Sequence, residues 1–200
     1  MDELNDWHVA PPDILRPVLG DAPNFHLIPV GNAGNITAYW AGYRDYQTAN
    51  KSKSLPVMIG FQAAGAAPIF YDRVIFTPET IASAIRIGNP ASWKQAAAAI
   101  EESKGAIDIV DDKEILEAQA WLAKHEGIFV EPASAASVAG LFKCCGSDAP
   151  KYSFERIPEK SRIVCTVTGH GLKDPDAFAR QRFTPMTVAA ELEAVAKAIA

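Results

Sequence analysis

Apolar runs and amphipathic runs alternate along the chain, and this alternation predicts its secondary structure. Short runs that are apolar throughout indicate strands buried on both faces, and longer runs with apolar residues three and four positions apart indicate helices. The pattern predicts strands at 25–30, 56–61, 106–110, 128–130 and 162–166, and helices at 36–50, 92–103, 111–126, 134–145 and 185–199. Buried strands separated by helices predict an α/β fold, with a parallel sheet covered by helices on both faces.

The turn between the first strand and the first helix is built from small residues: Gly31, Asn32, Ala33, Gly34 and Asn35. A strand, a glycine-containing turn and a helix N-terminus form an anion site, because free backbone N–H groups and the helix dipole face the ligand. The turn lacks the Lys-Ser or Lys-Thr pair of a Walker loop and the third glycine of the dinucleotide fingerprint. We therefore expect a phosphate held mainly by backbone, as in pyridoxal-phosphate enzymes. The alternative is an ordinary turn with an asparagine cap.

A second turn, at Thr168, follows the strand expected at 162–166. In open parallel sheets, ligands bind beyond the carboxyl ends of the strands. Both turns should therefore line one crevice, although they lie far apart in the sequence. Taken alone, Thr168 fits a strand-end hydroxyl that caps a nearby backbone group.

Composition narrows the classes of function. The 200 residues suit one domain, or one and a small part of another, and 48% hydrophobic residues can form a core. A net charge of −5 argues against a nucleic-acid partner, and no apolar run is long enough to span a membrane. The acidic start, Met1 to Leu4, is unlike a signal or transit peptide, so we expect a cytoplasmic protein. The cysteines and histidines have no metal-ligand spacing, so no metal site is expected.

Four segments closely resemble threonine synthase, in the order of that family: Leu27–Trp40, Thr80–Pro90, Gly127–Ser137 and Val167–Pro175. The family is a lyase with a tryptophan-synthase-β-like fold that uses pyridoxal 5'-phosphate to convert O-phospho-L-homoserine and water into L-threonine and phosphate. The resemblance implies that the cofactor phosphate binds at residues 31–35 and that Thr168 lies at the pyridine nitrogen. A neutral hydroxyl there leaves the ring nitrogen unprotonated and the ring a weaker electron sink.

The resemblance covers only the C-terminal half of that family. Residues 1–18 look like an unmatched leader, and residues 19–200 look like the cofactor-binding domain. The lysine that forms the Schiff base belongs to a Ser-Phe-Lys-Asp type motif in the first half, and this chain has no such motif. No catalytic residue is therefore assigned, and the chain alone should not complete the reaction cycle. A truncated gene, a split gene and a miscalled gene all fit, and the expected partners are the small-molecule substrate and either a second copy or a complementing N-terminal half.

Two other interpretations stay open. Serine or threonine dehydratases and cysteine synthases share the architecture, although their phosphate turns are typically richer in glycine or threonine. A non-catalytic remnant that keeps a phosphate pocket is also consistent with the missing lysine motif. The roles of four residues near the expected crevice are left open by their spacing alone: Arg86, Glu131, His170 and Lys173.

Overall fold

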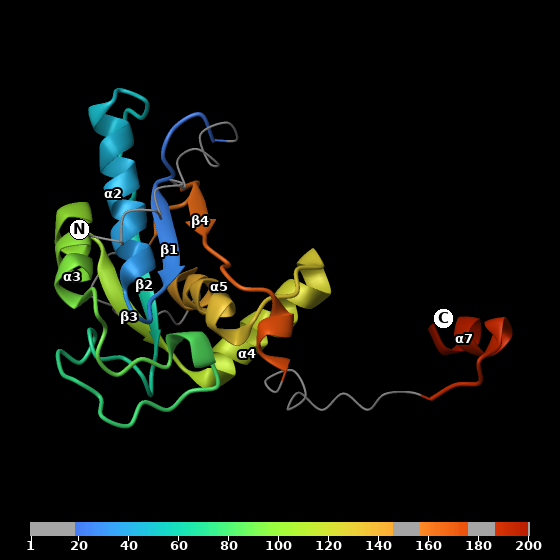
Figure 1. The fold of residues 1–200 in the computed structure, drawn as a ribbon. Coiled ribbons are helices and arrows are strands. Elements are labelled where there is room, and N and C mark those ends of the chain that lie inside the picture. The colour runs from blue at the N-terminus through green and yellow to red at the C-terminus, as the bar shows by residue number, and fades with distance from the viewer. Residues whose placement is uncertain (1–18, 146–156, 176–186, 200) are drawn as a thin grey trace, which may run out of the picture.

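The computed structural model describes residues 19–145, 157–175 and 187–199 (Figure 1). Its sheet has four strands in the order β3-β2-β1-β4, and every neighbouring pair is parallel. The strands are β1 (Phe25–Pro29), β2 (Val57–Ala63), β3 (Ala106–Val110) and β4 (Ile163–Cys165). The predicted parallel α/β fold is confirmed, and the proposed leader at 1–18 lies outside the described residues.

One predicted strand is wrong. Residues 128–130 form no strand, and Val130 makes only an isolated antiparallel bridge with His170. Gly127, with a φ of +66°, ends the preceding helical segment, and α5 begins already at Pro132. Between these two points, Val130 pairs with His170 and not with a strand of the sheet.

The helices follow the predicted pattern with shifted ends. They are α2 (Gly34–Thr48), α3 (Trp93–Ser103), α4 (Asp112–Trp121), α5 (Pro132–Cys145) and α7 (Leu192–Ile199), with a π-helical turn at Leu122–Glu126 and 3-10 turns at Ser83–Ile85 and Gly171–Lys173. The expected terminal helix is shorter than predicted, since 187–191 are not helical and 185–186 lie outside the described residues. α7 buries none of its residues.

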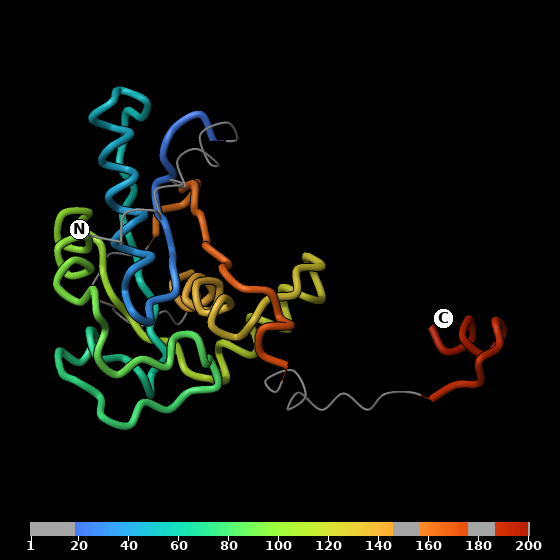
Figure 2. The backbone as a smooth tube through the Cα atoms, viewed as in Figure 1, coloured from blue at the N-terminus to red at the C-terminus, as the bar shows by residue number. Residues whose placement is uncertain are grey.

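Helices cover both faces of the sheet. α2 and α3 lie on one side of it and α4 and α5 on the other, as the ribbon and the backbone trace both show (Figures 1 and 2). Successive residues of β1 point to opposite faces of the sheet. Leu27 packs in the hydrophobic cluster with α4 and α5, and Ile28 packs in the cluster with α2 and α3. This two-sided burial explains why β1 has no polar alternation.

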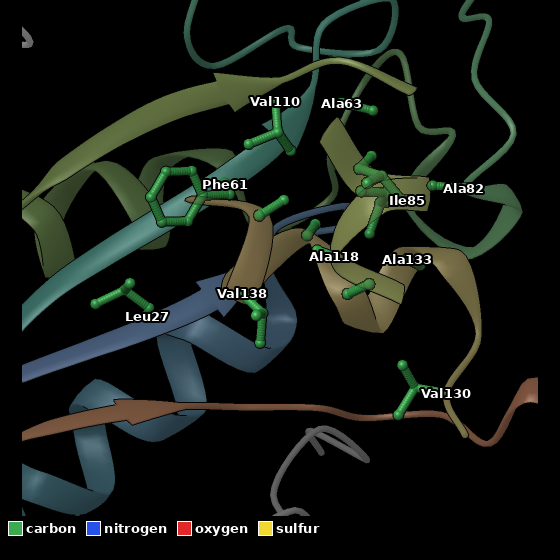
Figure 3. Packing of buried hydrophobic residues seen from close by; sticks show 14 of the residues in the cluster. Leu27, Phe61, Ala63, Ala82, Ile85, Val110, Ala118, Val130, Ala133 and Val138 are labelled. Carbon is green, nitrogen blue, oxygen red and sulfur yellow. The ribbon is translucent and has the colours of Figure 1, made fainter. Parts of the chain in front are cut away.

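α5 can lie close to the sheet because its inner face is made of small residues. Ala133 and Val138 of α5 point into the same cluster as Leu27 and Phe61 (Figure 3). A Cβ atom on Gly140 would collide with the Phe61 ring, so only glycine fits there. This close approach positions the N-terminus of α5 beside the end of β4, where the candidate site lies.

Local signals fixed the start of α4 as predicted. The Asp111 carboxylate accepts the Glu114 backbone N–H at 2.8 Å, and the Glu114 carboxylate accepts the Asp111 backbone N–H at 2.8 Å. This reciprocal capping box satisfies two donors that the helix itself leaves unpaired.

Candidate cofactor site

The turn after β1 presents an uncapped helix N-terminus. α2 begins at Gly34, and its N-cap residue, Ala33, has a left-handed backbone with a φ of +66°. No side chain among the described residues caps this end, and the first turn of α2 carries no acidic residue. Asn32, Gly34 and Asn35 are exposed. The first backbone N–H groups of α2 are therefore available to an anion, which the helix dipole also favours.

The two glycines of this turn have different roles. A Cβ on Gly31 would lie 2.9 Å from the Ile85 Cα and 3.0 Å from the Ala84 carbonyl oxygen, so Gly31 allows the turn to pack against that segment. Gly34 faces open space and has no left-handed backbone, which Ala33 has instead. Gly34 therefore leaves space for a ligand to approach the backbone, and Gly31 allows the turn to pack against the protein.

Asn32 fixes the turn to the segment that leads into α3. Its side-chain oxygen accepts the Ala91 backbone N–H at 2.8 Å, and its backbone carbonyl accepts the Ser92 N–H at 3.2 Å. Asn32 thus contributes its position in the turn and its backbone, while its side chain is engaged with the protein.

Thr168 leaves the sheet at the same edge as this turn. β4 is the parallel neighbour of β1, with Cys165 opposite Leu27, and the Thr166 N–H donates to the Leu27 carbonyl at 3.0 Å. Because the two strands run in the same direction, the segments that follow them emerge side by side. This is the shared edge expected from the sequence, and binding of a cofactor there stays a prediction.

Ser134, in the first turn of α5, holds the Thr168 turn in place. Its Oγ accepts the backbone N–H of Thr168 at 3.0 Å and that of Gly169 at 2.6 Å, and it lies 3.0 Å from the Thr168 Oγ1. Ser134 is fully buried, whereas Thr168 is exposed. Ser134 was not predicted as a site residue, because a serine in a helix rich in alanine has the pattern of a small packing residue.

Glu131 and Lys173 form an ion pair beside this turn. Their Oε1 and Nζ atoms are 3.2 Å apart, with the glutamate side chain buried and the lysine side chain 62% exposed. The Glu131 N–H donates to the Gly169 carbonyl at 2.9 Å, and a Cβ on Gly169 would collide with the Glu131 carboxylate. Glu131 therefore supports the backbone of the Thr168 turn.

The other residues whose roles the sequence leaves open lie at the surface. His170 is exposed, its Nδ1 accepts the Leu172 N–H at 3.2 Å, and its ring stands edge-on to Phe129. Arg86 and Asn89 are exposed on the segment that packs against Gly31. None of these contacts assigns a catalytic role to them.

A buried histidine links β1 to α2 and to the residue that follows β4. His26 of β1 has its Nδ1 3.0 Å from the Tyr43 hydroxyl and its Nε2 2.6 Å from the Thr166 Oγ1. Burial lowers the pKa of His26 to about 4, so the ring is neutral at pH 7. Ser137 of α5 donates to the Thr166 carbonyl at 2.9 Å and fixes the same strand from the opposite face.

Cys144 is buried and Cys165 is half-buried, and the described residues hold no cluster of metal ligands. Burial raises the pKa values of Cys144 and Cys165 to about 12, so both are protonated thiols. Within residues 19–145, 157–175 and 187–199, no three potential ligands gather into a metal site. None of the described helices is long and apolar enough to cross a membrane.

Comparison with known proteins identifies the family. The model of the family described as "Pyridoxal-phosphate dependent enzyme" matches residues 13–169, and the chain belongs to this family. The cofactor of the family is pyridoxal 5'-phosphate.

Individual relatives within this family that are similar to the chain include threonine synthases. The chain is 50% identical to threonine synthase of Synechocystis sp. over 184 residues, which are 91% of this chain and 46% of that protein. It is 55% identical to threonine synthase of Halalkalibacterium halodurans over 158 residues, 79% of this chain and 42% of that protein. The chain thus spans less than half the length of these curated relatives.

The structural likeness concerns the fold. A structure of maize serine racemase superposes with a TM-score of 0.61 at 18% identity, covering 84% of this chain and 48% of that chain. This match agrees with the predicted tryptophan-synthase-β-like architecture and carries no information about substrate.

Proposed function

We propose that this chain is the cofactor-binding half of an enzyme of the threonine synthase type, which converts O-phospho-L-homoserine and water into L-threonine and phosphate. One observation carries the proposal: the uncapped N-terminus of α2 and the Thr168 turn emerge side by side from neighbouring parallel strands. The four sequence segments that resemble threonine synthase include both turns. A homodimer, a complementing N-terminal half and a cytoplasmic location stay predictions from the sequence.

The residues fit the two polar ends of pyridoxal phosphate. Gly31, Asn32, Ala33, Gly34 and Asn35 would hold its phosphate through backbone N–H groups that nothing among the described residues caps. Thr168 would offer its hydroxyl to the pyridine nitrogen. When bound, the cofactor supplies an electron-withdrawing ring that stabilises a negative charge on the substrate.

The lysine that this chemistry needs has no counterpart in the proposed site. Lys173 lies near the Thr168 turn, but it pairs with Glu131. Lys143 lies on α5 and donates to the Ile109 carbonyl at the end of β3. We therefore propose that the lysine comes from the part of the enzyme that corresponds to the N-terminal half of these relatives.

Cofactor binding is the first test. Asn35 stands exposed in the first turn of α2, so Asn35→Asp would place a negative charge beside the phosphate. We expect pyridoxal phosphate to bind about tenfold more weakly, a loss typical of an adverse charge at a helix N-terminus. Gln47→Glu makes the same charge change in the exposed last turn of the same helix and should leave binding unchanged. Equal affinity in both variants would place the phosphate elsewhere.

Complementation tests the reaction. The residues that precede the matched region in the Halalkalibacterium halodurans threonine synthase would be added to this chain as a separate polypeptide, with pyridoxal phosphate. We expect phosphate release from O-phosphohomoserine, and borohydride should then fix the cofactor to the added half. Release of ammonia from serine or threonine instead would favour the dehydratase interpretation. Cofactor binding without turnover of any substrate would favour the non-catalytic one.

A further inference from the structure

The hydroxyl of Ser134 makes three close contacts, and these fix where its proton lies. The oxygen accepts two backbone N–H groups, from Thr168 and Gly169, at 3.0 and 2.6 Å. A hydroxyl oxygen has two lone pairs and one proton. Both lone pairs are therefore used, and the remaining contact, 3.0 Å to the Thr168 Oγ1, must use the Ser134 proton.

The opposite direction leaves an unsatisfied group. If Thr168 donated to Ser134, the Ser134 oxygen would accept three hydrogen bonds. Its own proton would then lie without a partner at a fully buried position. An unpaired buried donor is strongly disfavoured, whereas the exposed Thr168 hydroxyl can always reach water or a ligand.

We propose that Ser134 is a positioning residue that donates its proton to the Thr168 Oγ1 and so directs the Thr168 proton outward, as a hydrogen-bond donor to the site. The Thr168 hydroxyl can then donate its proton to a ligand atom that accepts a hydrogen bond. The identity of that atom as the unprotonated pyridine nitrogen of pyridoxal phosphate rests on the proposed function. The direction of the proton rests on the contacts alone.

Ser137 is a matched control on the same helix. It is also fully buried, and its hydroxyl donates to the Thr166 carbonyl at 2.9 Å. Ser137→Ala therefore removes a buried hydroxyl that supports the same strand without touching the Thr168 side chain. Ser134→Ala removes the proposed donor.

The proton direction can be measured without any cofactor. In a mixture of H₂O and D₂O, a hydroxyl that exchanges slowly splits its ¹³Cβ signal in two, and one that exchanges fast gives a single averaged signal. We expect a split signal for Ser134 and an averaged signal for Thr168. A split signal for Thr168, whatever the signal of Ser134, would show that the Thr168 proton is held inside the protein and would overturn the proposal.

Binding then tests the consequence for the ligand. Pyridoxal phosphate and its analogue with C–H in place of the ring nitrogen would be compared on the full chain. We expect about a fivefold preference for pyridoxal phosphate, as one neutral hydrogen bond gives. The preference should vanish in Ser134→Ala and persist in Ser137→Ala.

The outcomes separate the two proposals. A preference unchanged in Ser134→Ala, with both ligands weakened equally, would show a merely structural serine and overturn the positioning role. If neither ligand bound, the result would count against the proposed function. The exchange rates of the two hydroxyl protons would still test the donor direction.

Discussion

The two turns of the candidate site are built in different ways. The turn after β1 consists of consecutive residues, 31–35, and offers backbone N–H groups at an exposed helix start. The Thr168 turn depends on a side chain from α5, because Ser134 holds its backbone and its hydroxyl from 34 positions earlier in the chain. One is a local structure, and the other exists only when β4 and α5 have packed together.

This difference decides how each turn responds to change. A site made of backbone groups depends on steric access and on local charge, so it tolerates substitutions that preserve both. A site made of a buried hydroxyl network loses its geometry with a single oxygen atom.

Both turns together should still be insufficient for catalysis. They would hold the phosphate and the ring, but neither brings a lysine to the aldehyde. We expect no release of phosphate from O-phosphohomoserine by the chain alone with added pyridoxal phosphate, relative to a control without protein. Sustained turnover would mean that the catalytic lysine has been misplaced, and Lys173 would be the first residue to replace.

The histidine that links the two strands should make the fold sensitive to acid. The pKa of His26 is about 4 in the folded chain, against 6.5 as its ordinary value. The unfolded chain therefore takes up this proton first, and stability falls as the pH drops from 6.5 to 4. The difference corresponds to about 3 kcal/mol of unfolding free energy.

His26→Gln isolates this contribution. Urea unfolding of both proteins at pH 7 and pH 4.5 would be compared, so that titrating carboxylates common to both cancel. We expect the variant to lose less stability on acidification than the parent. An identical pH dependence in the two proteins would show that the pKa of His26 is the same in the folded and the unfolded chain.

The sequence predicted the parallel fold and the structures set by neighbouring residues, but it did not predict the side-chain contacts between distant segments. The turn between β1 and α2 and the Asp111 capping box follow from residues a few positions apart. Three apolar residues at 128–130 suggested a strand, but Val130 forms only an isolated bridge with His170, and α5 begins already at Pro132. Ser134 carries no signal in the sequence, because its partners become neighbours only through the β1–β4 pairing and the packing of α5.

The two glycines of the first turn should separate stability from binding. Gly31→Ala would force a Cβ against the Ile85 Cα and the Ala84 carbonyl, and we expect a loss of about 2 kcal/mol in unfolding free energy. Gly34→Ala meets open space in a helix and should gain up to about 1 kcal/mol. Chemical denaturation measures both.

A bulkier change at Gly34 should affect the ligand alone. The side chain in Gly34→Leu would occupy the open space through which a phosphate approaches the backbone, so pyridoxal-phosphate retention should fall strongly in a folded protein. Unchanged retention would remove residues 31–35 from the cofactor site.

The smallest effect is expected at the Lys173–Glu131 pair, which supports the second turn. The Lys173 side chain is 62% exposed, so water screens the pair, and Lys173→Met should cost about 1 kcal/mol of unfolding free energy. Lys113 makes a more exposed pair with Glu117, at 3.8 Å, and Lys113→Met serves as the control with a smaller loss. Urea unfolding at low and at about 1 M salt would check both, since screening should remove most of each loss. A Lys173→Met loss that persists at high salt would instead show that the buried Glu131 carboxylate depends on this lysine, and that the Thr168 turn rests on a buried charge as well as on Ser134.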